Sequence, residues 1–278
     1  MTRSRILSAV LAIAGCILLA GCATPMNAPR SAIVVPPAPI LPPPPIHPNG
    51  QVLWRIVNGK CVPDQQANAR PDPCTEVSIG GGVDKGYVVL KDRVGASQYL
   101  VMPTRLITGI EDAQLLASGA TNYFDPAWRV RRLVDQRLGT TLTRDDVGIA
   151  VNSIYGRSQD LLHLHVDCLR IDVRDALHGR LAHIRRTWSA PLTLVGHPYY
   201  ALRLDGDDRV PTDPFVELAR LKVPPAEMGA WTLVLAGATF SDGPGFVLLA
   251  GRTDPAAGFD GSGEELQDHQ CTGHVARG

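Results

Sequence analysis

Hydrophobic positions along the chain follow two periods, one of two residues and one of a helical turn. Alternating or continuous apolar runs bounded by Gly, Pro or Asp predict strands. These are expected at residues 86–92, 98–103, 146–153, 161–167, 230–238 and 245–251. Helical spacing with start and stop signals predicts helices at residues 122–139, 172–188, 213–222 and 262–271. Because no regular strand–helix–strand order appears, the pattern predicts an α+β fold, mainly an antiparallel sheet with packed helices.

The first apolar run, at the N-terminus, is typical of a secretory signal over residues 1–21. It ends in "LAGC", which resembles a bacterial lipobox and predicts lipidation of Cys22. A plain signal peptide and an uncleaved anchor are the alternatives. We expect a protein held on a lipid bilayer in the cell envelope and facing the periplasm. The outer membrane is favoured over the inner one, because Ala23 stands where inner-membrane lipoproteins often carry Asp.

A proline-rich segment separates this signal from the folded domain. "PRSAIVVPPAPILPPPPIHPNG" favours an extended polyproline II conformation, which makes a semi-rigid tether. We assign residues 22–51, including His47, to the tether and residues 52–278 to one domain.

The overall charge excludes one class of partner. The chain has 278 residues, with 27 basic and 27 acidic side chains. A protein that binds nucleic acid usually carries a basic excess to neutralise phosphates, so no nucleic-acid partner is expected.

Four cysteines remain once the signal is removed and Cys22 is lipidated: Cys61, Cys74, Cys168 and Cys271. An even number in an oxidising compartment suggests two disulfides. Cys61 and Cys74 are close in sequence with a proline-rich loop between them, which favours Cys61–Cys74 and, by remainder, Cys168–Cys271. Four cysteines allow three pairings, and a zinc site built from them is a competing interpretation.

The stretch "SQDLLHLHVDC", residues 158–168, carries the candidate chemistry. Alternate strand residues share a face, so His163 and His165 lie together with Asp167, about 7 Å apart from Cα to Cα. Three interpretations compete. The histidines are structural, they bind a metal with Asp167, or one attacks a phosphorus while the other assists.

The segment "NSIYGRSQDLLHLHVDC" resembles the nucleotide-binding segment of the histidine triad (HIT) superfamily. The middle and last histidines of the triad correspond to His163 and His165, and the first position is Leu161. This departure argues against the usual dinucleoside or aminoacyl-nucleotide substrates.

One branch of that superfamily is closer, the bacterial CDP-diacylglycerol pyrophosphatases. Blocks similar to theirs run through the chain, namely "WRIVNGKC", "GYVVLKD", "QYLVMPT", "GHPYY", "DPFVELA" and "DHQC". The resemblance implies a HIT-like fold and hydrolysis of CDP-diacylglycerol in a membrane to CMP and phosphatidic acid. It further implies that His163 forms a nucleotidyl-histidine and that His165 donates to the phosphate or the leaving group, with no metal or cofactor.

The resemblance also implies a set of substrate-binding residues, and a homodimer is compatible with it. This set is Asn152, Gly156, Arg157, Ser158, Lys91, His197 and His269. Two alternatives stay open: a metal-dependent phosphohydrolase, and a non-catalytic lipoprotein that binds a nucleotide or a metal.

Overall fold

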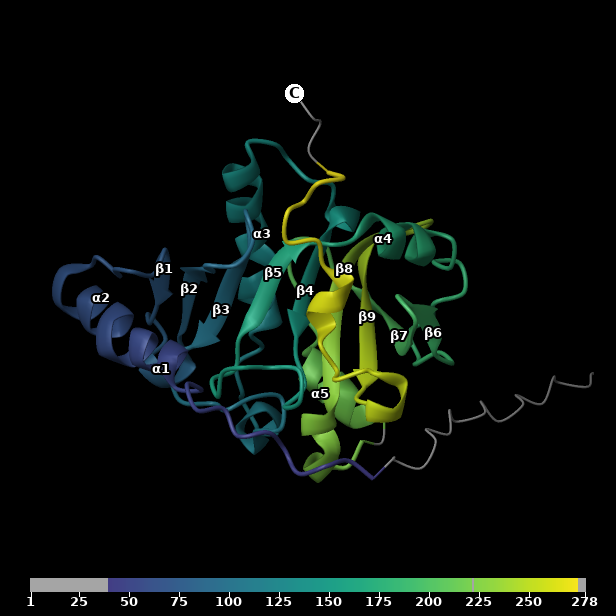
Figure 1. The fold of residues 1–278 in the computed structure, drawn as a ribbon. Coiled ribbons are helices and arrows are strands. Elements are labelled where there is room, and N and C mark those ends of the chain that lie inside the picture. Colours follow the sequence, from purple (N-terminus) through teal and green to yellow (C-terminus); the bar gives the residue numbers. More distant parts are fainter. Residues whose placement is uncertain (1–39, 222, 275–278) are drawn as a thin grey trace, which may run out of the picture. The chain divides into compact units, whose positions relative to one another are not determined.

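The computed structural model describes residues 40–221 and 223–274 (Figure 1). The predicted signal and the predicted lipidation site Cys22 lie outside the described residues. No helix in the described ranges is long and apolar enough to cross a bilayer.

One antiparallel sheet of nine strands organises the described residues, in the order β1-β2-β3-β5-β4-β8-β9-β7-β6. The strands are β1 Glu76–Ser78, β2 Tyr87–Lys91, β3 Tyr99–Pro103, β4 Val147–Val151, β5 Leu164–Cys168, β6 Leu192–Leu194, β7 His197–Asp205, β8 Trp231–Phe240 and β9 Gly243–Arg252. Every pair of neighbouring strands is antiparallel. Six strands were predicted from the sequence, whereas the short β1 and β6 and the longer β7 were missed.

Helices cover both faces of the sheet. They are α1 Val52–Ile56, α2 Val62–Asn68, α3 Phe124–Leu138, α4 Ile171–His178 and α5 Pro214–Arg220, and a π-helical turn joins α1 to α2. Local signals fix α3 and α5. Gly139 ends α3 in the left-handed conformation, and the Asp213 side chain accepts a hydrogen bond from the Phe215 N–H at the start of α5.

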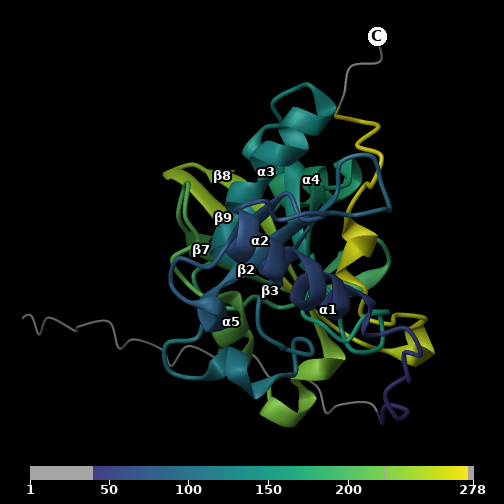
Figure 2. The same cartoon turned by 90° about the vertical axis from the view of Figure 1, so that its left-hand side faces the viewer.

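The two faces of the sheet carry different layers, which the edge view separates (Figure 2). Trp128 of α3 and Phe215 of α5 belong to the core on one face, with Leu164 of β5. On the other face, α4 and the C-terminal segment 259–271 cover Ala150 and Val234. The α+β class and the mainly antiparallel sheet are therefore confirmed.

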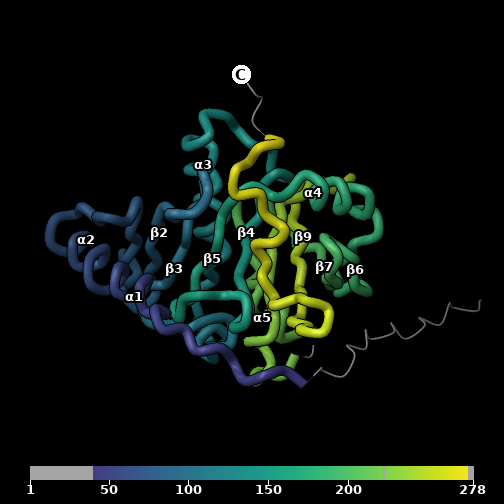
Figure 3. The backbone as a smooth tube through the Cα atoms, in the orientation of Figure 1, coloured from purple at the N-terminus to yellow at the C-terminus, as the bar shows by residue number. Residues whose placement is uncertain are grey.

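Two predicted helices are wrong in extent, and backbone pairing explains both. The helix expected at 172–188 ends at His178, because Arg185 must be extended for its carbonyl to accept the Arg203 N–H of β7. The segment 262–271 forms only a 3-10 turn at Gly263–Leu266. Beyond that turn the Asp268 N–H donates to the Cys168 carbonyl, so the chain runs extended alongside the end of β5 (Figure 3).

Both predicted disulfides are present, which confirms the pairing favoured by the sequence. Cys61–Cys74 closes the loop after α2, with Cα atoms 5.6 Å apart. Cys168–Cys271 ties the C-terminal segment to the end of β5, with Cα atoms 5.5 Å apart. A zinc site built from the four thiols is excluded, since each sulfur is bonded to another.

Candidate active site

His163 and His165 lie at the start of β5, on the face that the C-terminal segment covers. In the register of the sheet His165 stands between Leu100 of β3 and Ala150 of β4. Both rings are almost fully buried, and their centroids are 4.8 Å apart in an edge-on arrangement. Leu164, between them, packs into the core on the opposite face, as the alternation predicts.

His163 is held as a neutral imidazole. Its Nδ1 lies 2.6 Å from the Leu161 carbonyl oxygen, so Nδ1 carries the proton that it donates there. Burial, and then the charge of His165, lower the pKa of His163 to about 3. At neutral pH the other nitrogen, Nε2, therefore keeps a free lone pair.

His165 is oriented by a carboxylate that sequence analysis missed. Its Nδ1 lies 3.0 Å from Glu264 Oε2, which also accepts a hydrogen bond from Gln98 Nε2 at 3.0 Å. Burial raises the pKa of Glu264, but the attraction of His165 and hydrogen bonds from His165, Asn152 and Gln98 outweigh it, so the pKa lies far below its usual range. The ionised Glu264 favours a proton on His165 Nδ1. His165 Nε2 is buried with no hydrogen-bond partner among the described residues.

The same carboxylate gathers two of the predicted residues around the histidines. Asn152, directly after β4, donates to Glu264 Oε1 at 2.7 Å and accepts from the Gly263 N–H at 2.9 Å. His269 Nε2 lies 3.4 Å from Glu264 Oε2. Asn152, His163, His165 and His269 therefore form one cluster with Glu264 at its centre.

His269 is itself held by a buried acid. Its Nδ1 lies 2.9 Å from Asp167 Oδ2, and Asp167 also accepts from the Ser97 hydroxyl at 2.9 Å. The hydrogen bond to Asp167, opposed by burial, raises the pKa of His269 above its ordinary value. The Cys168–Cys271 bridge fixes the segment that carries His269.

The loop after β4 carries Gly156 and Ser158, and the two residues have different surroundings. The Gly156 N–H donates to Ser153, at 3.1 Å to its hydroxyl. A Cβ at Gly156 would lie 2.9 Å from the Ser262 nitrogen, so glycine permits close packing against the C-terminal segment. Ser158 is exposed, and in the described part of the chain its hydroxyl makes no hydrogen bond.

Arg157, which the sequence predicts to contact phosphate, is paired with carboxylates in this structure. Its guanidinium forms two 2.7 Å hydrogen bonds with Glu111 and lies 3.5 Å from Asp160. The side chain is almost fully buried, and a Cβ at Gly109 would overlap it. Arg157 therefore joins the loop after β4 to the segment after β3.

Lys91 and His197 lie outside the cluster. Lys91 Nζ donates to the carbonyls of Asp92 and Gly95, at 2.6 and 3.2 Å, in the turn whose Ala96 N–H donates to the His269 carbonyl. His197 begins β7, which three strands, β9, β8 and β4, separate from β5. At about 4.8 Å per strand that is roughly 19 Å. The sequence block "GHPYY" therefore does not bring His197 to the histidine pair.

Among the described residues, one set of side chains converges closely enough to share a metal ion: Asp167, Cys168 and Cys271. Its two sulfurs are bonded to each other, so this set does not offer two thiolates. His163 and His165 do not belong to it.

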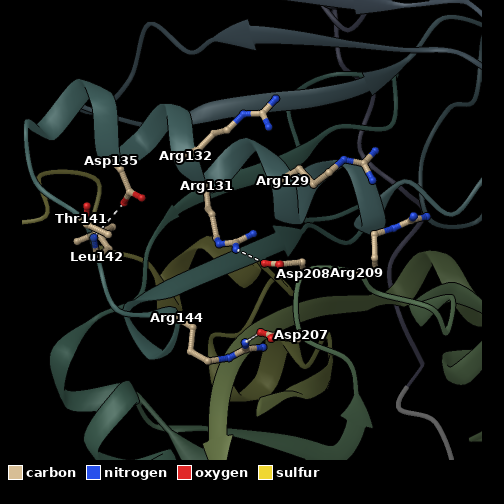
Figure 4. A pocket seen from close by; sticks show the side chains of 10 residues that line it. All are labelled: Arg129, Arg131, Arg132, Asp135, Thr141, Leu142, Arg144, Asp207, Asp208 and Arg209. Carbon is tan, nitrogen blue, oxygen red and sulfur yellow. Dashed lines mark hydrogen bonds and ion pairs between the residues drawn. The ribbon is translucent and has the colours of Figure 1, made fainter. Parts of the chain in front are cut away.

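An arginine-rich pocket of about 640 Å³ borders α3, on the side of the sheet away from the histidines (Figure 4). Its cations are mostly paired. Arg144 bonds Asp207 at 2.6 Å and Arg131 bonds Asp208 at 3.0 Å. These ion pairs hold the turn before α5 against α3, and the pocket adds no group to the histidine cluster.

Comparisons with known proteins agree with one another. A family model described as CDP-diacylglycerol pyrophosphatase matches residues 48–274. A CDP-diacylglycerol pyrophosphatase of Yersinia pestis is 38% identical over 226 residues, which cover 80% of this chain and 84% of that protein.

Proposed function

This chain belongs to the CDP-diacylglycerol pyrophosphatase family, and from that membership we propose how its histidines work. The chain hydrolyses CDP-diacylglycerol, and cleavage of the pyrophosphate bond gives CMP and phosphatidic acid. The observation that carries the mechanism is the neutral His163 ring beside a His165 ring held by Glu264.

In the first step, His163 Nε2 attacks the phosphorus on the cytidine side. A P–N bond forms, the bond from phosphorus to the bridging oxygen breaks, and that oxygen leaves with its electron pair on phosphatidate. The contact with the Leu161 carbonyl supports this role, because it holds the proton on Nδ1 and leaves the nucleophilic lone pair on Nε2.

His165 supplies the proton for the leaving oxygen. The Glu264 carboxylate stabilises its imidazolium form, so Nε2 carries a proton that it gives to phosphatidate as the bond breaks. The neutral His165 then accepts a proton from the water that attacks the cytidylyl phosphorus. The P–N bond breaks, CMP leaves, and both histidines return to their starting states.

Other groups stabilise charge and position the substrate. Ser158, with its free hydroxyl, donates to a phosphate oxygen, and Asn152 keeps Glu264 turned toward His165. We further propose a HIT-like fold, which the antiparallel sheet and the H-x-H strand support. The lipidated, periplasm-facing anchor at Cys22 belongs to the same proposal, because it would hold the enzyme near a substrate that stays in the bilayer.

The test combines isotope incorporation with trapping. Hydrolysis in H₂¹⁸O should place the label in CMP and not in phosphatidate, because water attacks the cytidine-side phosphorus. A single turnover with substrate labelled at that phosphorus, quenched in alkali, should yield an acid-labile adduct on His163. His197→Ala should form the same adduct, because this ring lies far from the pair.

Two results would overturn the mechanism. Label in phosphatidate would show that water or the nucleophile attacks the other phosphorus. Loss of turnover in EDTA, restored by added metal, would favour the metal-dependent alternative.

A further inference from the structure

Five large apolar side chains are exposed in the described part of the chain. Ile40 and Ile46 lie in the N-terminal segment, Val52 begins α1, and Leu106 lies in the loop after β3. Ile40 and Ile46 are almost fully accessible, at 101% and 91%. The fifth, Val94, is 59% exposed and lies in the turn between β2 and β3.

The segment with Ile40 and Ile46, residues 40–51 and here called the strap, is fixed to the domain. The Tyr155 hydroxyl donates to the Pro42 carbonyl at 2.9 Å. His47 Nδ1 lies 2.8 Å from Asp160 Oδ1, and the Asp160 N–H donates to the Gly50 carbonyl at 2.7 Å. The sequence assigns His47 to the semi-rigid tether, and these contacts hold the last residues of that segment against the loop after β4.

The strap therefore contacts the loop that leads directly into the proposed catalytic pair. Asp160, its main partner, lies three residues before His163 and also contacts Arg157 at 3.5 Å. Through Arg157 and Glu111 the same ion-pair cluster reaches the loop that carries Leu106. In Figure 1 the strap runs along the lower edge of the molecule, below the start of β5.

The substrate sets a condition that this edge meets. In CDP-diacylglycerol the pyrophosphate is joined directly to the glycerol of a lipid whose acyl chains remain in the bilayer. A catalytic histidine reaches that phosphorus only if the protein surface beside it approaches the membrane interface closely. Exposed aliphatic side chains on such a surface gain free energy by entering the interface.

We infer that the strap, with Ile40 and Ile46, is a bilayer-seating edge that turns the His163–His165 pair toward the lipid headgroup. This inference rests on the proposed function. It assigns the strap a task besides tethering, since a flexible tether limits distance and leaves orientation free.

The experiment compares two substrates with the full chain. One is long-chain CDP-diacylglycerol in phosphatidylcholine vesicles, and the other is a short-chain CDP-diacylglycerol dissolved as a monomer. In the double variant Ile40→Glu, Ile46→Glu, turnover of the vesicle substrate should fall by roughly tenfold or more, while turnover of the monomer stays within about twofold. Val94→Glu is the matched control, and neither rate should change.

Each result decides between defined alternatives. An unchanged vesicle rate in the double variant would overturn the inference, and so would an equal loss on both substrates, which would indicate a damaged loop. An equal loss in Val94→Glu would show a general charge effect and would also overturn it. If the wild type cleaves neither substrate, the proposed function fails instead.

A direct measurement of contact uses fluorescence. In Ile46→Trp, brominated phosphatidylcholine should quench the introduced indole on vesicle binding, and in Val94→Trp it should not quench it beyond the wild-type level. Quenching that is equal in the two variants would overturn the inference.

Discussion

Two consecutive glutamates, Glu264 and Glu265, each hold a histidine on the same face of the sheet. Glu264 lies 3.0 Å from Nδ1 of His165, and Glu265 lies 2.9 Å from Nδ1 of His197. The two pairs thus share the same chemical groups and nearly the same geometry. Their surroundings differ, and that difference separates the pair that we propose to be catalytic from a structural one.

In the Glu265–His197 pair, each member has a further neighbour that contacts it. His197 stacks on Phe259 at 4.4 Å, and the Tyr199 hydroxyl donates to Glu265 at 2.7 Å. The Glu264 pair has a second imidazole, His163, at 4.8 Å, and His165 Nε2 lacks a partner in the described part of the chain. A buried nitrogen without a partner is costly unless a ligand binds it. A Glu–His pair therefore indicates catalysis only where a nucleophile and an unsatisfied atom accompany it.

The largest expected effect comes from removing the nucleophile. His163→Ala should lower kcat for CMP release by about 10⁴-fold or more, because no other group forms the P–N bond. His197→Ala should stay within about threefold of wild type. Release of CMP from short-chain CDP-diacylglycerol measures both. Near wild-type turnover in His163→Ala would show that His163 is not the nucleophile and that the two Glu–His pairs do not differ in the way proposed.

The next test removes the negative charge of each glutamate in turn. Glu264→Gln keeps the size but loses the charge that stabilises the His165 imidazolium, so kcat should fall roughly 10²-fold with KM little changed. Glu265→Gln is the matched control and should stay within about threefold of the wild type. Equal losses in the two variants would mean that the glutamates do not differ in role.

The sequence was sufficient for the histidine pair but not for its partner. The alternation of residues 161–167 is local and predicts that His163 and His165 share a face. Glu264 lies 99 positions after His165, and only the pairing of the C-terminal segment with the end of β5 brings it there. Glu264 also stands in a stretch with helical spacing, where an acidic residue near the first turn is ordinary. Gln98, a polar residue at the start of an apolar strand, was the one local signal that a polar group lies beside the histidine pair.

Two predicted binding residues, Arg157 and His197, have partners in the structure that the sequence does not reveal, for a related reason. Arg157 stands in a loop that resembles a phosphate-binding loop, but its partner Glu111 comes from a segment that no local pattern connects to it. His197 lies in a block similar to the family, and family blocks include core residues as well as site residues. β8 and β9 were predictable because each contains a nearly continuous apolar run, at 230–238 and 245–251. The three-residue β1 and β6 depend on partners distant in sequence, and β7 was missed because Pro198, Arg203 and Asp205 interrupt its apolar pattern.

A smaller effect on activity is expected when the disulfide that ties the C-terminal segment to β5 is removed. Replacing Cys168 and Cys271 by Ala should lower the free energy of unfolding by roughly 2–5 kcal/mol and kcat by about tenfold, because the bridge spans 103 residues and holds the His269 segment. Replacing Cys61 and Cys74, which are 13 residues apart and lie on either side of α2, should lower stability without a comparable loss of kcat. Denaturant unfolding and turnover measure the two effects. Equal losses of kcat in the two double variants would contradict the link between the bridge and the site.

The smallest effect concerns stability in acid. The pKa of His163 is about 3 in the folded protein, against an ordinary value of 6.5, so the unfolded chain binds a proton that the folded state rejects. Its contribution to stability is complete above pH 6.5 and is lost progressively as the pH falls toward 3. Between pH 7 and 5, His163→Asn should therefore lose about 2 kcal/mol less unfolding free energy than the wild type. Equal acid sensitivity of wild type and His163→Asn would show that His163 is not held neutral, and the proposed nucleophile would then lack its lone pair.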